Sequence, residues 1–193
     1  MNNKVICIAG RKGSGKSTLA RYLQNMIIQA GYGCFIQPIA GPLKSVAQWW
    51  GLDVTSKDHV PCPFGGLTVR QFLQQFGQAM RGIDRNFWLK LWVQRAMDRP
   101  GAILIVDDLR FQNEREWFSN VNASLIRLLR NGDLPKDTDI SENDLNDTPN
   151  RDFDLAVSPN LGIAETQQLV WPHVASWLEL TTERKTESNT SLT

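Results

Sequence analysis

The chain has 193 residues, of which 41% are hydrophobic and 21% are charged, and its formal net charge is +1. These values are typical of a globular protein whose core needs no disulfides, and the charge disfavours a stable partnership with nucleic acid. No apolar stretch approaches a membrane span, and the start, MNNKVICIAG, lacks the pattern of an export signal. We therefore expect a soluble cytoplasmic protein with no membrane partner.

The cysteine and histidine content disfavours a zinc site or a disulfide framework. The three cysteines are Cys7, Cys34 and Cys62, they form no C-x-x-C pair, and the two histidines stand alone. Cys7 and Cys34 lie in expected strands, so we interpret them as small core residues.

Residues 4–18, KVICIAGRKGSGKST, join an apolar run to a glycine-rich turn and then to a helical pattern. They match the phosphate-binding loop G-x-x-x-x-G-K-[ST], and the strand before it and the helix after it disfavour an ordinary glycine-rich turn. In such a loop, backbone N–H groups and the helix dipole face phosphate oxygens, the lysine reaches the β- and γ-phosphates, and the hydroxyl binds Mg²⁺. We expect ATP to bind Gly10, Lys12, Gly13, Ser14, Gly15, Lys16, Ser17 and Thr18.

Hydrophobic periodicity predicts strands that alternate with helices along the chain. We expect strands at 5–9, 34–40, 102–106 and 125–129, with a weaker one at 155–157. We expect helices from the loop to Gly31 or Gly33, from Pro42, after an N-cap at Thr68, across 87–97, and across 163–180 with a break or kink at Pro172. This alternation predicts an α/β fold with a doubly wound sheet of about five parallel strands and the nucleotide at their carboxyl ends.

Three segments fall outside this alternation. Residues 51–66 contain several prolines and glycines and indicate a loop or insertion. Residues 131–154 carry eight acidic side chains, which is typical of a solvated loop but also suits a lid. The tail at 181–193 has very little apolar content, so we expect it to be disordered after a single domain that spans 1–180.

The apolar run at 102–106 ends in two aspartates, and either could hold the Mg²⁺ opposite Ser17. If the strand continues, Asp107 and Asp108 point to opposite faces, so one meets the metal and the other reaches the acceptor pocket. The alternative for each is that it only caps the next element of the chain. Arg110 is placed to neutralise a transferring phosphoryl group, and Asn113 and Glu114 are candidates to orient it.

Polar side chains interrupt the core-like pattern of residues 68–88. Arg70 and Gln74 share one helix face, where a guanidinium and an amide suit a phosphate and a base edge. Each of these two, and Arg81, could instead be a solvated surface residue. Trp88 could stack on a base, although packing is the commoner role of a tryptophan.

Five blocks together resemble the bacteriophage-type deoxynucleoside monophosphate kinases of the P-loop kinase superfamily. They are IAGPLK at 39–44, TVRQFLQQFGQAMR at 68–81, IDRNFW at 83–88, DDLRFQNE at 107–114 and Ser141-Glu142. The resemblance covers the chain from the first strand to about Leu161. It implies a nucleoside-monophosphate-kinase-like fold, with an acceptor-binding helical region at about 42–98 and a lid-like loop at about 131–154.

By this resemblance, the reaction transfers the ATP γ-phosphate to a deoxynucleoside monophosphate (dNMP) with Mg²⁺, supplying DNA precursors, in the host cytoplasm if the source is viral. It implies acceptor contacts from Lys44, Arg70, Gln74, Arg81, Trp88, Asp108 and Arg110, and a phosphate or lid contact from Arg130. Together with the phosphate-loop chemistry, we expect catalytic roles for Lys16, Arg81, Asp108 and Arg110, and metal contacts from Ser17 and Asp107. The chain departs from the family at Asp139, where the pattern has histidine, and its lid-like segment is poor in arginine.

Two other functions compete with this interpretation. One is a P-loop kinase that acts on another small acceptor, which would not need Arg70, Gln74 and Arg81 together. The other is a nucleotide-dependent switch or DNA-associated ATPase, which the near-zero net charge disfavours. A homodimer is possible if some of the seven tryptophans are exposed.

Overall fold

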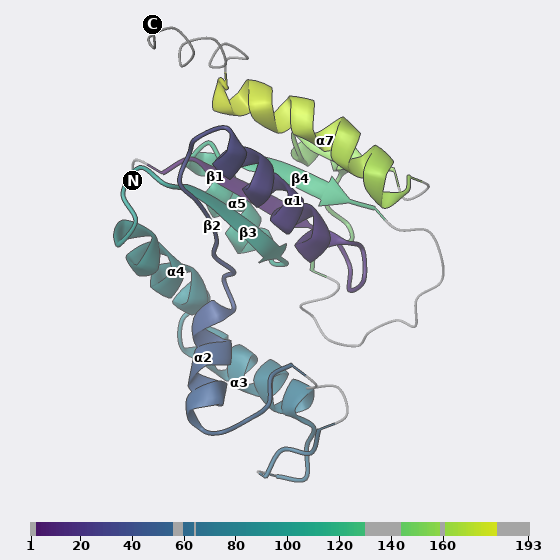
Figure 1. Ribbon diagram of the computed structural model, residues 1–193. Helices are drawn as coiled ribbons and strands as arrows, with labels where there is room; N and C mark the ends of the chain where they lie inside the picture. Colours follow the sequence, from purple (N-terminus) through teal and green to yellow (C-terminus); the bar gives the residue numbers. More distant parts are fainter. Residues whose placement is uncertain (1–2, 56–59, 64, 130–143, 159–160, 181–193) are drawn as a thin grey trace, which may run out of the picture.

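Five parallel strands form one sheet in the order β2-β3-β1-β4-β5 (Figure 1). The computed structural model describes residues 3–55, 60–63, 65–129, 144–158 and 161–180. The strands are β1 (Val5–Ala9), β2 (Cys34–Ile36), β3 (Ile103–Leu109), β4 (Ser124–Leu128) and β5 (Leu155–Val157). The expected α/β fold is confirmed, and β1, which carries the phosphate-binding loop at its end, lies in the centre of the sheet.

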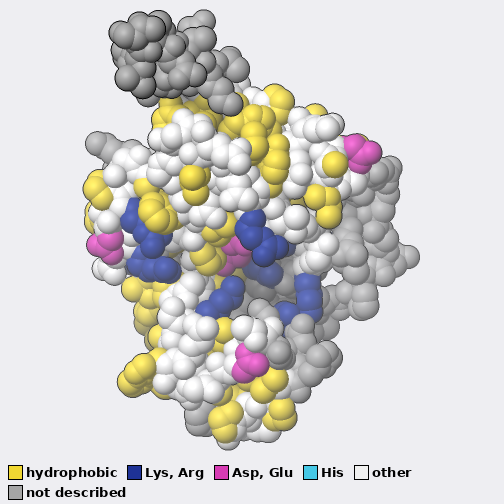
Figure 2. Space-filling view, viewed as in Figure 1, with side chains coloured by type: hydrophobic (Ala, Val, Ile, Leu, Met, Phe, Trp, Pro, Cys, Tyr) yellow, Lys and Arg dark blue, Asp and Glu magenta, His cyan; other side chains and the backbone are white. Residues whose placement is uncertain are grey.

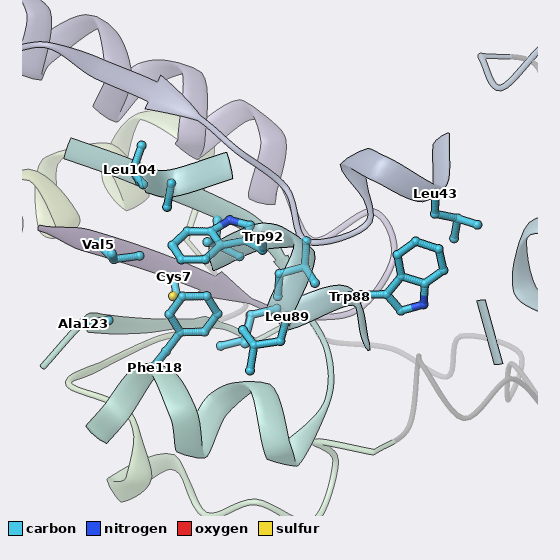
Figure 3. Packing of buried hydrophobic residues seen from close by; sticks show 14 of the residues in the cluster. Val5, Cys7, Leu43, Trp88, Leu89, Trp92, Leu104, Phe118 and Ala123 are labelled. Atoms are coloured by element: carbon cyan, nitrogen blue, oxygen red, sulfur yellow. The ribbon is translucent and has the colours of Figure 1, made fainter. Parts of the chain in front are cut away.

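Helices cover both faces of the sheet, which is why β1 is apolar at every position. α1 (Lys16–Gln29) and α7 (Ile163–Leu178) lie on one face, and α4 (Phe87–Met97) and α5 (Gln112–Asn120) lie on the other (Figure 1). Ile6 and Ile8 pack toward α1 and α7, whereas Cys7 packs toward Trp92 of α4 and Phe118 of α5 (Figure 3). Cys7 and Cys34 are both buried, as expected of core residues.

A helical extension projects from the sheet and consists of α2 (Gly41–Trp49), α3 (Val69–Ile83) and the start of α4 (Figure 1). The expected N-cap of α3 is confirmed. The Thr68 hydroxyl accepts a hydrogen bond from the Gln71 N–H at 3.2 Å, and the Gln71 side-chain oxygen accepts one from the Thr68 N–H at 2.9 Å. This reciprocal cap fixes where the helix begins.

Several element boundaries differ from those expected. β2 ends at Ile36 because Pro38 has no N–H and because the N–H groups of Ile39 and Ala40 bind a side chain of β3. β3 does not end before the two aspartates but runs through them to Leu109. α7 runs through Pro172 without a break.

Parts of other predictions lie outside the described residues, namely Arg130, most of the lid-like loop and the tail at 181–193. Within the described ranges, no helix is both long and apolar enough to cross a bilayer.

Candidate active site

The turn between β1 and α1 has a backbone path that only glycine allows at its first position. Gly10 has φ +150°, and a Cβ there would lie 2.6 Å from the Ser14 hydroxyl and 2.7 Å from the Leu128 carbonyl oxygen. Gly13 and Gly15 also have positive φ, at 74° and 90°. The expected phosphate-binding loop therefore has both its predicted flanking elements and its required backbone turns.

Lys16 opens α1 and is folded back over this loop. Its side chain is largely buried, and its Nζ donates to the carbonyl oxygens of Gly10 at 2.6 Å and Arg11 at 2.7 Å. The positive charge is thus held above the turn where the loop begins. In the part of the chain that the structure describes, the buried hydroxyl of Ser14 has no hydrogen-bond partner.

Ser17 and Asp107 meet at the carboxyl end of β3. The Ser17 hydroxyl donates to Asp107 Oδ2 at 2.8 Å. Burial, and next the Asp108 carboxylate, raise the pKa of Asp107 above its usual range, although Ser17 and the Lys44 ammonium act in the opposite direction. Hydroxyl and carboxylate oxygens are the ligands that Mg²⁺ prefers, so this pair fits the expected metal.

Asp108 faces the other side of the sheet because β3 continues through both aspartates. Its Oδ1 accepts the N–H of Ile39 at 2.7 Å and its Oδ2 accepts the N–H of Ala40 at 3.0 Å. The carboxylate therefore anchors the chain where it enters α2, the helix that carries Lys44. Asp107 therefore lies at Ser17, whereas Asp108 lies at the helical extension.

Glu114, on α5, joins α3 to the end of β3. Its Oε2 accepts the backbone N–H groups of Arg110 at 3.3 Å and Phe111 at 3.1 Å, and its Oε1 accepts Nη2 of Arg81 at 3.4 Å. The Arg81 guanidinium also lies over the Phe111 ring, 3.8 Å from its centroid. Burial raises the pKa of Glu114 to about 7, although Arg81 acts in the opposite direction.

The expected partners of Arg110 are therefore only partly placed as predicted. Glu114 binds the backbone of Arg110, but Asn113 donates from Nδ2 to Asn86 Oδ1 at 2.8 Å and so ties α5 to the start of α4.

One face of α3 carries the polar residues that the sequence singled out. Arg70, Gln74 and Arg81 are each partly buried, and their spacing of four and seven residues brings them to one face of the helix. Arg81 lies at the end of this row nearest Glu114. The helix thus presents a line of polar side chains that leads toward the carboxyl end of the sheet.

Trp88 does not occupy the position expected of a base-stacking residue. It is 3% exposed, its indole N–H donates to the Gly77 carbonyl oxygen at 3.0 Å, and its ring meets Phe76 and Phe87 edge-on. Figure 3 shows it beside Leu43, within the core of the helical extension. In this structure Trp88 holds α3 against α4, so the expected stacking on a base is not available to it.

A cavity of about 260 Å³ lies beside the loop, at the carboxyl ends of β1, β3 and β4. Its lining includes Arg11, Arg110 and Arg127. Arg127 was not identified from the sequence, although a charged residue inside the apolar strand was a usable signal. It donates to the carbonyl oxygens of Thr148 and, at 2.9 Å, of Leu145. These bonds hold the described part of the expected lid-like loop, which begins at residue 144, against β4.

That segment also reaches the phosphate-binding loop. The Arg11 Nε donates to Asn146 Oδ1 at 3.3 Å, and the Gln112 N–H donates to Asp144 Oδ2 at 2.7 Å. Figure 2 shows Lys and Arg side chains gathered around a hollow between the sheet and the helical extension, with an acidic side chain inside it. The site is therefore mainly cationic, which suits anionic ligands.

Comparisons with known proteins match this chain to a family model, to a viral relative and to a solved structure. A family model described as deoxynucleotide monophosphate kinase matches residues 63–165, more than half of the chain. A protein of Acanthamoeba polyphaga mimivirus that carries the provisional name deoxynucleotide monophosphate kinase is 28% identical over 183 residues, which cover 83% of this chain and 91% of the relative. Among solved structures, the Cys556Ala mutant of the Mycobacterium tuberculosis APS kinase CysC aligns over 92% of this chain and 98% of its own, with a TM-score of 0.48 and 16% identity. This structural likeness is too distant to bear on the reaction.

Proposed function

The chain belongs to the deoxynucleotide monophosphate kinase family, and we propose that it transfers the γ-phosphoryl group of ATP to a dNMP, giving ADP and a deoxynucleoside diphosphate. One observation carries the proposal: the phosphate-binding loop and the polar face of α3 both approach the carboxyl end of β3. A donor and an acceptor could therefore be held facing each other at this edge of the sheet.

The donor half consists of the loop and Lys16. Backbone N–H groups of the loop and the amino end of α1 would face the polyphosphate, and the Lys16 ammonium is held within 2.7 Å of the loop carbonyls, close to where the β- and γ-phosphates would lie. The proposed ATP contacts are Gly10, Lys12, Gly13, Ser14, Gly15, Lys16, Ser17 and Thr18.

Ser17 and Asp107 would hold Mg²⁺, since both offer oxygen ligands and already lie in contact. When bound, Mg²⁺ would neutralise charge on the β- and γ-phosphate oxygens. The hydrogen bond between Ser17 and Asp107 keeps the two ligands together on facing elements, α1 and β3.

The acceptor half consists of α2, α3 and the turn after β3. We assign the dNMP contacts to Lys44, Arg70, Gln74, Arg81 and Arg110. Glu114 binds the side chain of Arg81 and the backbone of Arg110, so both residues lie near the end of β3. Gln74 and Arg70 lie farther along α3 and would meet the sugar and base. Asp108 supports this half by anchoring the start of α2.

The proposed reaction needs little help with proton transfer. The second pKa of a phosphate monoester is about 6, so the acceptor is largely dianionic at neutral pH and needs no general base. The main obstacle is the approach of two highly negative groups. Lys16, Arg81 and Arg110 would offset that repulsion and stabilise the charge that develops in the transition state.

The test is an assay of ADP release from ATP with a panel of dNMPs, ribonucleoside monophosphates and unphosphorylated nucleosides. We expect release that depends on a dNMP and is lost in Lys16→Ala. Equal release without any acceptor would instead indicate an ATPase or switch. Release only with an unphosphorylated acceptor would identify a kinase for another small molecule.

A further inference from the structure

One buried carboxylate connects two arginine-bearing segments that lie far apart in the sequence. Glu114 is 3% exposed and receives one hydrogen bond from the side chain of Arg81 and two from the backbone at Arg110 and Phe111. A buried carboxylate is costly unless it is paired and hydrogen-bonded, so its position depends on all of these donors.

We infer that Glu114 is a positioning residue for acceptor binding, which holds the Arg81 guanidinium in place over Phe111 and beside the backbone of Arg110. The inference rests on the proposed dNMP kinase activity. In this role, Glu114 affects the binding of the acceptor only through Arg81 and does not itself contact the substrate.

The geometry around Arg81 supports this role. Its guanidinium is held by the Phe111 ring at 3.8 Å on one face and by Glu114 at its Nη2 atom. An arginine side chain loses much rotamer freedom when it binds a ligand, and prior fixation reduces that cost. Arg81 lies in the last turn of α3, so its position also depends on how α3 is held against α5.

The two oxygens of Glu114 have separable tasks. Oε2 accepts the N–H groups at the start of α5, which is a structural role, and Oε1 meets Arg81. Glu114→Gln keeps an oxygen for the backbone N–H groups but turns an NH₂ group toward the guanidinium. The substitution therefore removes the contact with Arg81 while it retains the helix cap.

The experiment compares wild type, Glu114→Gln, Arg81→Gln and the double variant, with Glu116→Gln as the matched control. Glu116 lies on the same helix, is exposed, and contacts Gln112 at 3.1 Å. The dNMP Kd is measured by calorimetry without ATP, the KM values for ATP and dNMP by steady-state kinetics, and the Tm by thermal unfolding.

We expect Glu114→Gln to raise the dNMP Kd and KM by about tenfold, in the range of measured pairwise couplings between contacting residues. The KM for ATP should stay within about twofold, since the substitution leaves the donor loop untouched. Because Glu114 acts through Arg81, adding Glu114→Gln to the Arg81→Gln variant should produce no further loss of dNMP affinity. Glu116→Gln should match the wild type.

Three results would overturn the inference: an unchanged dNMP Kd in Glu114→Gln, a full effect that persists in the Arg81→Gln background, or an equal rise in the KM for ATP. If Glu114→Gln does not fold, Glu114→Asp serves as the second variant. Its side chain is shorter by one methylene group, so its carboxylate lies farther from Arg81 and dNMP binding should weaken. Wild-type affinity in that variant would contradict the inference. A wild-type protein that binds no dNMP would overturn the proposed function as well, whereas tight wild-type binding beside an unaffected Glu114→Gln overturns the inference alone.

Discussion

Asp107 and Asp108 are adjacent in the sequence, yet they act on opposite sides of β3. Asp107 accepts the Ser17 hydroxyl at 2.8 Å, and Asp108 accepts two backbone N–H groups at the start of the helical extension. The alternation of side chains along a strand explains this division, because β3 continues through both residues. The sequence alone could not assign these two positions, because the direction of each side chain depends on where the strand ends.

Asp107→Asn should raise the Mg²⁺ concentration needed for half-maximal turnover and lower kcat by about two orders of magnitude, because it removes a charged ligand from the proposed metal site. The measurement is a Mg²⁺ titration of the initial rate at saturating ATP and dNMP. Asp98→Asn, at an exposed position after α4, serves as the control. A Mg²⁺ dependence equal to that of the wild type would remove Asp107 from the metal site.

Lys16→Ala and Arg110→Ala should each lower turnover by at least about two orders of magnitude, because each removes a cation that is proposed to stabilise the transferring phosphoryl group. The far-UV circular dichroism should stay as in wild type. Lys90→Ala is the charge-matched control, since Lys90 forms an exposed ion pair with Asp84 at 2.5 Å on the helical extension. Near-normal turnover in either site variant would exclude that residue from catalysis.

The raised pKa of Glu114 predicts a pH-dependent stability. In the folded protein its pKa is about 7, against an ordinary value of 4.5, so between these two pH values the native state keeps a proton that the unfolded chain has released. The contribution of Glu114 to the free energy of unfolding should therefore decrease as the pH rises from about 4.5 to about 7. The charged groups that face it are Arg81 on α3 and Asp108 on β3.

Urea unfolding of wild type and Glu114→Gln at a series of pH values tests this prediction. The difference in free energy of unfolding between the two proteins should change in favour of the variant across that window and level off above it. Other carboxylates titrate in both proteins and cancel in the comparison. A difference that is constant with pH would show that Glu114 titrates normally.

Among the elements, α3 carries three of the five residues that are proposed to contact the acceptor, namely Arg70, Gln74 and Arg81. Its capping box fixes where the helix begins, and its partly buried polar residues lie on one face. Periodicity alone predicted this helix and the shared face of Arg70 and Gln74. The contact between Arg81 and Glu114 was not predicted, because Glu114 lies 33 residues farther along the chain.

Gln74→Ala should raise the KM for dNMP severalfold and leave the KM for ATP unchanged, because the amide is proposed to meet the acceptor and lies on α3, away from the loop. Gln75→Ala is the matched control, since Gln75 is the next residue of the helix and is exposed. The measurement is the pair of KM values for each variant. An equal effect of both substitutions would indicate a general effect on α3.

Residues that are contiguous in the chain could be predicted from the sequence, whereas contacts between distant segments could not. The phosphate-binding loop is contiguous, so its residues and flanking elements could be predicted together. The role of Arg127 could not, because the Leu145 and Thr148 carbonyl oxygens that it binds come from a distant segment. Trp88 was ambiguous for a similar reason, because only the packing of α3 on α4 shows that its ring is buried.

The whole molecule is nearly neutral, but its positively charged side chains are concentrated in one region. The formal net charge is +1, yet Lys and Arg side chains gather around the hollow between the sheet and the helical extension (Figure 2). This arrangement favours small anionic ligands held at one place over an extended polyanion. The possible homodimer stays a prediction; Trp49, which is 83% exposed at the end of α2, is the surface residue that such a contact would be expected to use.

The most direct measurement of the central claim follows the label from ATP carrying ³²P in the γ-phosphate during incubation with a dNMP and Mg²⁺. The account predicts that the label appears in the β-phosphate of the deoxynucleoside diphosphate, in amounts equal to the ADP formed. Lys16→Ala should abolish this transfer. Label found only in inorganic phosphate, at the same rate with and without dNMP, would contradict the account.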